Sequence, residues 1–128
     1  MKPLVVVGDA LLDRDVTGQV SRISPDAPVP VFDEGEGRDR PGGAGLTAAL
    51  AAADGRAVVL VTAIGGDGAG SRLRQLLAQA GVRVLELPYR GDTPQKIRLQ
   101  AGTQVVLRLD RGTAPGRPGA PGPDVLAA

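Results

Sequence analysis

Residues Arg40–Leu50 read Arg-Pro-Gly-Gly-Ala-Gly-Leu-Thr-Ala-Ala-Leu, a glycine pair that opens directly into an alanine-rich segment. Gly42 and Gly43 carry no side chain, so the backbone at this point can approach a ligand closely. The first amides of a helix lack partners within the helix and favour oxygen-rich or anionic groups. The stretch therefore predicts a turn and helix start suited to a polyol or a phosphate, although a plain turn explains it equally well.

Continuous aliphatic runs and helical patterns alternate on both sides of this turn. The runs at 4–7 and 57–61 are typical of buried parallel strands, and 83–87 is expected to form a third strand. A helix is expected over about 44–53 and a second one after Asp67, a good N-cap residue. Each helix carries apolar residues on one face, made of Leu46, Ala49, Leu50 and Ala53 in the first and Leu73, Leu76, Leu77 and Ala80 in the second. This order predicts an α/β fold with a parallel sheet.

The remaining segments predict short strands outside that sheet. Strands are expected at 16–20 and at 29–32, the latter at a sheet edge because Pro30 cannot donate to a ladder. We expect 34–40 to form a loop or frayed hairpin, and 95–100 with 105–109 to form a hairpin or two neighbouring strands. Eight of the twelve residues at 112–123 are Gly or Pro, so no regular element is expected there. The pattern thus predicts an α/β unit, with few core strands, from which a strand insertion projects.

Composition excludes several classes of function. The 128 residues include no Cys and no His, which rules out thiol nucleophiles, Ser-His-Asp catalysis and histidine metal sites. The net charge of +1 gives no field that would attract nucleic acid or an anionic membrane, and only Phe32 and Tyr89 are aromatic. No segment is long and apolar enough to span a membrane. We expect a cytoplasmic protein that binds neither nucleic acid nor membrane and uses no protein-held metal.

The charged candidates allow two interpretations each. Asp9 and Asp13 follow the first strand, where α/β proteins bind ligands and a carboxylate can accept hydrogen bonds from sugar hydroxyls, but they also suit a turn and a solvated loop. Lys96 and Arg98 alternate with aliphatic residues and so share one strand face. They could hold a phosphate or form an ordinary solvated face. The glycine-rich run 65–70 lacks the Lys-Ser/Thr of a P-loop and favours a turn capped by Asp67.

Five motifs are arranged in a familiar order: Val6-Val7-Gly8-Asp9 with Leu12-Asp13-Arg14, then Ser21–Val31, Arg40–Ala44, Ile64–Gly70, and Lys96-x-Arg98 with Leu107–Asp110. Together they resemble the N-terminal half of a ribokinase-like, or pfkB, carbohydrate kinase over roughly residues 4–110. The Arg-Ile-Ser-Pro-Asp-Ala-Pro-Val-Pro segment resembles the heptose 7-phosphate kinase branch in particular, whereas the other motifs are shared more widely.

The resemblance implies a fold and an activity. Such kinases transfer the γ-phosphoryl group of ATP, with Mg²⁺, to a hydroxyl of a sugar or sugar phosphate. The sugar lies above the carboxyl ends of the parallel strands, under a small β lid that also forms a homodimer. By this resemblance, residues 1–111 form a partial kinase domain with lid strands at about 15–33, and 112–128 form a flexible Gly/Pro-rich tail.

It also implies a set of substrate-binding residues. Asp13 and Arg14 would contact the sugar, and the glycine pair would present backbone amides to it. Lys96 and Arg98 would face the substrate or the phosphate it already carries. The implied substrate-binding set is therefore Asp13, Arg14, Gly42, Gly43, Lys96 and Arg98.

Two departures from the family pattern qualify what is expected. Leu46 stands where the family has an Asn whose amide contacts the sugar, and a sugar group left unpaired costs about 1–3 kcal/mol. The Gly-Ala-Gly-Asp motif that carries the catalytic Asp and the nucleotide site does not occur in the sequence. Because phosphoryl transfer needs donors, metal and base together, we expect no catalytic residue, no bound ATP or Mg²⁺, and no activity of this chain alone.

The leading interpretation is thus a truncated kinase that retains the sugar-binding and lid half, which is a split subunit, a degenerate gene product or a fragment. Its candidate partners are a second copy, joined through the lid strands, or a complementary C-terminal half. The alternative is a non-catalytic sugar-binding or dimerisation module. A dinucleotide-binding domain is disfavoured, since Gly8–Leu12 does not supply G-x-G-x-x-G after the first strand. We expect a chain with so small a sheet to be only marginally stable in isolation.

Overall fold

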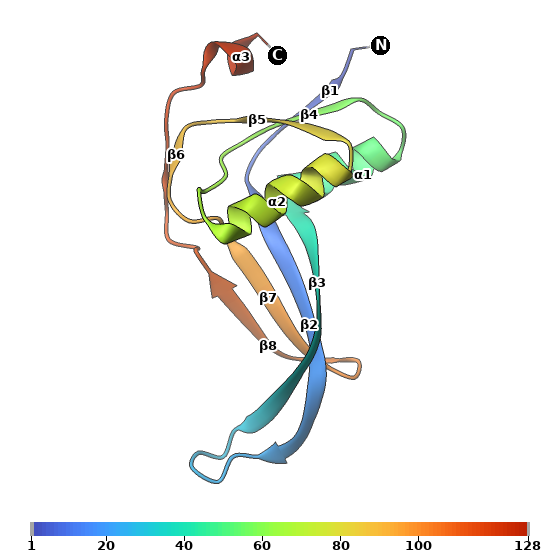
Figure 1. Cartoon of the computed structure of the whole chain (residues 1–128), viewed down its shortest axis with the longest axis vertical. Coiled ribbons are helices and arrows are strands. Elements are labelled where there is room, and N and C mark those ends of the chain that lie inside the picture. The colour runs from blue at the N-terminus through green and yellow to red at the C-terminus, as the bar shows by residue number, and fades with distance from the viewer. Residues whose placement is uncertain (1, 128) are drawn as a thin grey trace.

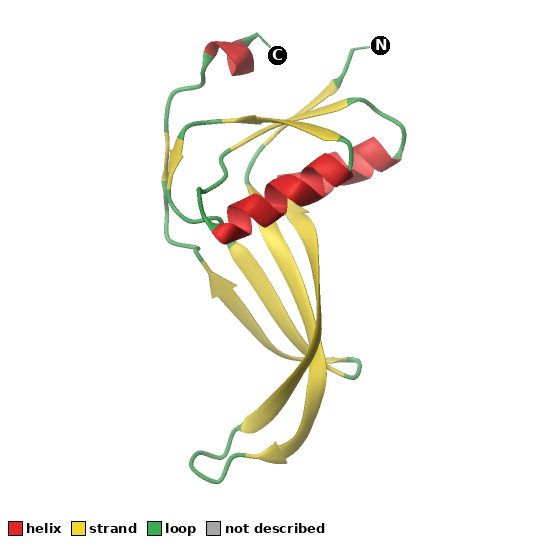
Figure 2. Ribbon diagram, viewed as in Figure 1, coloured by secondary structure: helices red, strands yellow, loops and turns green. Residues whose placement is uncertain are grey.

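The computed structural model describes residues 2–127 and has two parts, an α/β unit and a long twisted sheet that extends away from it (Figure 1). The α/β unit is built on a parallel sheet of order β1-β4-β5, formed by β1 (Leu4–Val7), β4 (Val58–Thr62) and β5 (Val82–Glu86). Helices α1 (Ala44–Ala53) and α2 (Gly68–Gln79) lie on the same side of this sheet (Figure 2). The predicted α/β class and both predicted helices are confirmed.

The core of the α/β unit lies between these helices and the sheet. Leu73 and Leu77 of α2 and Ala48 of α1 are fully buried against the inward face of the sheet, which includes Val58, Leu60 and Val82. The opposite face carries Val59, Val61 and Leu85, and against it pack two partly buried side chains, Leu87 after β5 and Val125 of the short helix α3 (Pro123–Leu126). Parallel sheets normally have both faces covered, and here Val5 and Val7 at the β1 edge are exposed.

The second sheet has the order β3-β2-β7-β8 and is formed by β2 (Ala10–Ile23), β3 (Pro30–Gly43), β7 (Gln95–Ala101) and β8 (Gln104–Arg111). β2 pairs antiparallel with β3 and parallel with β7, so the two hairpins are joined side by side. β3 lies at an edge, as Pro30 predicts. The strands are longer than expected. Residues 34–40, predicted to form a loop or a frayed hairpin, belong to the regular part of β3. Cross-strand pairing with β2 compensates there for the weak strand propensity of Gly and Asp.

The orientation of α1 also differs from the prediction. Its buried residues are Gly45 and Ala48, while Leu46 and Leu50 are 39% and 62% exposed. Small residues let the helix axis approach the sheet and α2 closely, and a methyl group on Gly45 would lie only 3.6 Å from Leu77 Cδ2. The leucine face predicted from the spacing is therefore the wrong face. The predicted face of α2 is confirmed for Leu73 and Leu77.

The tail after β8 forms a two-residue strand within 112–123, where no regular element was expected. β9 (Arg117–Pro118) pairs with β6 (Tyr89–Arg90), and α3 follows it. This two-residue pairing brings the tail across the loop that enters β7, with Gly119 N donating to Pro88 O. Across residues 2–127, no helix is long and apolar enough to cross a membrane.

Candidate functional site

Asp13 and the glycine pair meet where the second sheet joins the α/β unit. Asp13 lies on β2 and Gly42 near the end of β3, and a methyl group on Gly42 would lie 2.5 Å from Asp13 Oδ2. Gly42 therefore has to be glycine for its backbone to lie against the carboxylate. A carboxylate beside these amides accepts hydrogen bonds from hydroxyl groups and repels a phosphate. The geometry favours a polyol over a phosphate at this turn.

Gly43 has a different structural role from Gly42. Its φ of 58° lies in the left-handed region, which L side chains rarely adopt, and it is the N-cap residue of α1. Next to it, Ala44 N donates to Asp9 O at 2.9 Å, which ties the start of the helix to the end of β1. Asp9 thus acts here through its backbone, and Gly43 makes the sharp turn from strand to helix.

Lys96, Arg98 and Arg108 lie on the same face as Asp13. Lys96 is the Cα partner of Asp13 across β2 and β7, and Arg98 Nη1 lies 3.6 Å from Asp13 Oδ1. Arg108 of β8 is the Cα partner of Arg98, and side chains of paired residues project from the same face. The predicted sharing of one face by Lys96 and Arg98 is confirmed, and Ile97 between them is buried on the other.

Sequence reasoning assigned no role to Arg108 and Asp110. Arg108 donates twice to Asp110, with Nη2–Oδ2 at 2.8 Å and Nε–Oδ1 at 3.0 Å. The hydrogen bond from Arg108 lowers the pKa of the Asp110 carboxyl, and the charges of Lys96 and Arg98 act in the same direction. Their i, i+2 spacing on a strand was the signal that could have placed both residues on one face.

Two polar atoms of this face are left without a partner. Asp13 Oδ1 and Arg98 Nη1 are both buried and make no hydrogen bond to any residue within 2–127. Nearly all buried polar atoms in folded proteins have a partner, so such atoms indicate a functional site or an unfilled hydrogen-bonding position. Each could bond a ligand oxygen or hydroxyl. Together they give the face one acceptor and one cationic donor side by side.

Arg14 is separated from the other predicted residues. It follows Asp13 on β2 and therefore projects from the opposite face of the sheet. There it donates through Nε to Asp39 Oδ1 at 2.9 Å and through Nη1 to Gln95 Oε1 at 3.3 Å. The structure brings Asp13, Gly42, Lys96 and Arg98 together and leaves Arg14 on the far side.

A cavity of about 420 Å³ adjoins the site at the carboxyl edge of the parallel sheet. Leu11 is shared by the two, because it lines the cavity and would also lie 2.5 Å from a methyl group on Gly42. The walls come from the end of β1, the loop before β7 and the tail, and include Asp9, Ala63, Tyr89, Pro94 and Thr113. The site is thus an open charged face with a hollow at one end.

The second glycine-rich turn, at residues 65–70, is capped by its own Asp67 side chain. Asp67 Oδ1 accepts from Gly70 N at 2.9 Å, as predicted for an N-cap, and Oδ2 accepts from Thr93 N at 2.9 Å. Burial raises the pKa of the Asp67 carboxyl, but these hydrogen bonds outweigh it and leave the pKa lowered. An ionised carboxylate on these amides excludes a phosphate, so the turn does not fit a nucleotide.

The family that the motifs resemble is identified independently by its sequence model. The model described as pfkB family carbohydrate kinase matches residues 1–112. The chain belongs to this family. It is 56% identical over 110 residues to the bifunctional protein HldE of Streptomyces coelicolor, covering 86% of this chain and 24% of that protein. It is 42% identical over 108 residues to the D-beta-D-heptose 7-phosphate kinase of Bordetella bronchiseptica, covering 84% of this chain and 34% of the kinase.

Two solved kinase structures share the fold. A carbohydrate kinase from Agrobacterium tumefaciens superposes with a TM-score of 0.67 at 23% identity, covering 87% of this chain and 36% of the kinase. Phosphofructokinase-2 from Escherichia coli, solved in complex with fructose-6-phosphate, gives a TM-score of 0.64 at 22% identity, with 91% and 36% covered. This pfkB chain therefore has a partial ribokinase-like fold and spans about a quarter to a third of its curated relatives.

The described residues of this pfkB chain do not fit the ATP and Mg²⁺ that the family uses. The turn at Asp67 excludes a phosphate, and the turn at Gly42 lies against the Asp13 carboxylate. Within residues 2–127, no group of three or more His, Cys, Asp or Glu side chains is placed to hold a metal ion. No step involving nucleotide or metal is therefore derived from these residues.

Proposed function

We propose that this chain is the sugar-phosphate-binding half of a carbohydrate kinase with a substrate of the heptose 7-phosphate type. Asp13 accepts hydrogen bonds from sugar hydroxyls, and the backbone of Gly42 and Gly43 flanks it. Lys96 and Arg98 bind the phosphate that the sugar already carries. The single observation that carries the proposal is the buried pair Asp13 Oδ1 and Arg98 Nη1, which joins a hydroxyl acceptor to a phosphate donor on one face.

We also propose that the residues for phosphoryl transfer lie outside this chain. Support comes from the missing Gly-Ala-Gly-Asp motif and from the poor fit of both glycine-rich turns to a nucleotide. The natural partner is the complementary C-terminal half of the kinase, whether on the same polypeptide or another. The exposed Val5 and Val7 on a parallel edge strand suit a partner that adds strands and covers the open sheet face.

Two assays on the folded chain test these statements separately. Isothermal titration with D-heptose 7-phosphate should show binding that weakens by about 10- to 100-fold in Asp13→Asn, the loss of a hydrogen bond to a charged group. An ATP-coupled assay should show no ADP release above background. Absence of binding by the folded chain would overturn the substrate proposal, and turnover like that of a full-length kinase would overturn the proposed lack of activity.

The second candidate function is self-association through the apolar face of the second sheet. Leu107 is 53% exposed, and a groove of about 460 Å³ lies on this face. Its lining combines the apolar side chains of Val16, Phe32, Ile97, Leu99 and Leu109 with the charged side chains of Arg14, Glu34, Asp39 and Arg111. Exposed apolar patches of this kind mark interaction sites. A second copy of the chain could pair these faces and leave the charged faces free for substrate.

A further inference from the structure

The cluster behind the charged face connects four elements of the chain. Asp39 of β3 accepts hydrogen bonds from Arg14 of β2 at 2.9 and 3.4 Å, and Arg14 also donates to Gln95 of β7 at 3.3 Å. Arg72 of α2 donates through Nε to Asp39 Oδ2 at 3.2 Å. One carboxylate thus bonds to the second sheet and to the α/β unit at the same time.

The shared carboxylate of this cluster is largely shielded from solvent. The Asp39 side chain is only 14% exposed, although each arginine side chain is more than a third exposed. Burial raises the pKa of the Asp39 carboxyl, but the hydrogen bonds and charges of Arg14 and Arg72 outweigh it and lower the pKa. Asp39 is therefore ionised at neutral pH, and its charge-assisted bonds are stronger than neutral ones.

The cluster also lies directly behind the candidate substrate residues. Arg14 is the chain neighbour of Asp13, and Gln95 is the chain neighbour of Lys96. Adjacent residues of a strand project from opposite faces. The hydrogen-bonded cluster therefore lies on the opposite face of the same strands, next to the positions that carry Asp13 and Lys96.

We propose that Asp39 is a positioning residue that holds the second sheet at a fixed angle to the α/β unit, through Arg14 and Arg72, and so sets the geometry of the face that carries Asp13 and Lys96. Its consequence for ligand binding rests on the proposed function. The proposed angle between the second sheet and the α/β unit does not rest on the proposed function, because this angle depends only on bonds within the chain.

Distance measurement between the two parts tests the angle directly. The sequence contains no cysteine, so spin labels can be attached at Gln19→Cys on β2 and Gln79→Cys on α2, both exposed positions. We expect one narrow distance distribution in the labelled parent and a broader, shifted one in Asp39→Asn. Glu86→Gln is the matched control, because it breaks the pair between α2 and β5 at Arg74 and Glu86 without touching the second sheet.

Arg72→Lys gives a second variant that keeps the charge, and it should broaden the distribution less than Arg72→Gln does. If Asp39→Asn does not fold, the comparison of Arg72→Lys with Arg72→Gln tests the proposed angle by itself. A distribution as narrow in Asp39→Asn or Arg72→Gln as in Glu86→Gln would overturn the proposal.

Binding of D-heptose 7-phosphate gives a readout beyond stability. At equal folded fraction, Asp39→Asn should bind about tenfold more weakly than Glu86→Gln, and Asp39→Glu should recover part of the loss. Equal affinity of Asp39→Asn and Glu86→Gln would overturn the positioning of the site. If the parent itself does not bind, the proposed function fails, whereas the distance measurement still decides the angle.

Discussion

Asp13 Oδ1 and Arg98 Nη1 lie 3.6 Å apart on neighbouring strands, both buried and neither hydrogen-bonded within residues 2–127. The separation is too long for a good hydrogen bond, so the hydrogen-bonding capacity of both atoms is left unused. A buried acceptor beside a buried cation is suited to a ligand that offers a hydroxyl to one and an anionic oxygen to the other. This is the chemistry of a sugar phosphate.

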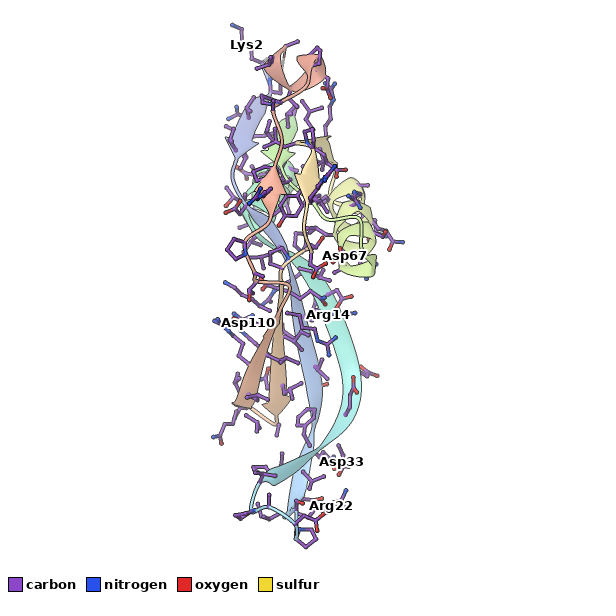
Figure 3. All side chains as sticks on the ribbon, turned by 90° about the vertical axis from the view of Figure 1, so that its left-hand side faces the viewer. Lys2, Arg14, Arg22, Asp33, Asp67 and Asp110 are labelled. Atoms are coloured by element: carbon purple, nitrogen blue, oxygen red, sulfur yellow. The ribbon has the colours of Figure 1, made fainter. Side chains whose placement is uncertain are left out.

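Arg98→Gln should therefore weaken the binding of a sugar phosphate. It removes the charge that faces the phosphate but leaves Asp13 in place for the hydroxyls, so affinity for D-heptose 7-phosphate should fall about 10- to 100-fold. Titration calorimetry measures this. Asp33→Asn, which breaks only the ion pair with Arg22 near the far end of the second sheet (Figure 3), should bind like the parent. An equal loss in both variants would contradict the assignment.

Gly42→Ala should destabilise the junction of the two parts. The added methyl group would lie 2.5 Å from both Asp13 Oδ2 and Leu11 Cδ1, and such overpacking costs about 1–3 kcal/mol. Urea denaturation measures the change in the free energy of unfolding. Gly37→Ala is the matched control on the same strand, because nothing lies within 4 Å of its added methyl group. Equal stability of the two variants would show that the Gly42 backbone is not confined.

Asp67→Ala should weaken the start of α2 and the loop that enters β7. Loss of an N-cap costs about 1 kcal/mol, and the amide of Thr93 loses its acceptor as well. We expect a loss of about 1–3 kcal/mol in the free energy of unfolding, measured by urea denaturation at pH 7. Amide exchange at Gly70 and Thr93 should accelerate in the variant. Unchanged exchange at both amides would contradict the capping role.

Stability should be insensitive to pH near neutrality and should fall in acid. The sequence has no histidine, and the pKa values of Asp39 and Asp67 are lowered in the folded chain. Near pH 4 the unfolded chain thus binds more protons than the folded chain, so stability rises with pH there. The contribution is complete above the ordinary pKa of about 3.9 and is lost as pH falls through the lowered values. Denaturation at pH 6, 5 and 3 measures it.

The two aspartates can be separated in the same experiment. Asp39→Asn and Asp67→Asn should each lose less stability between pH 5 and pH 3 than the parent does, since each variant lacks one titrating carboxylate. A parent-like slope in both variants would mean that other carboxylates cause the acid sensitivity.

Leu107→Glu should oppose self-association of the apolar face. A charge in the centre of an exposed apolar patch must be desolvated when a second copy covers it. Sedimentation velocity should show a dimer for the parent and a monomer for the variant at the same concentration. Gln104→Glu, which adds the same charge at an exposed position on the same strand, should leave the dimer intact. A parent that sediments as a monomer would contradict the proposed interface.

Elements whose patterns are local could be predicted from the sequence. The strand at 4–7, both long helices, the cap at Asp67 and the hairpin at 95–109 were predicted with nearly correct bounds. The strand at 34–40 was missed, because a Gly- and Asp-rich run has no strand propensity of its own and is held by pairing with β2. The packed face of α1 was missed because the leucines dominate the pattern, whereas close packing selected Gly45 and Ala48.

The candidate site likewise has some features that the sequence predicts and others that only the tertiary structure shows. The sequence by itself determined that Lys96 and Arg98 share a face, that Gly42 and Gly43 form the turn into α1, and that the motifs are those of a pfkB kinase, because neighbouring residues and fixed spacings encode these features. Only the tertiary structure decided that Arg98 meets Asp13, and that Asp39 joins Arg14 to Arg72. These contacts join strands and a helix far apart in the chain. The pairing of such segments depends on the packing of the whole fold, and no local pattern of residues specifies it.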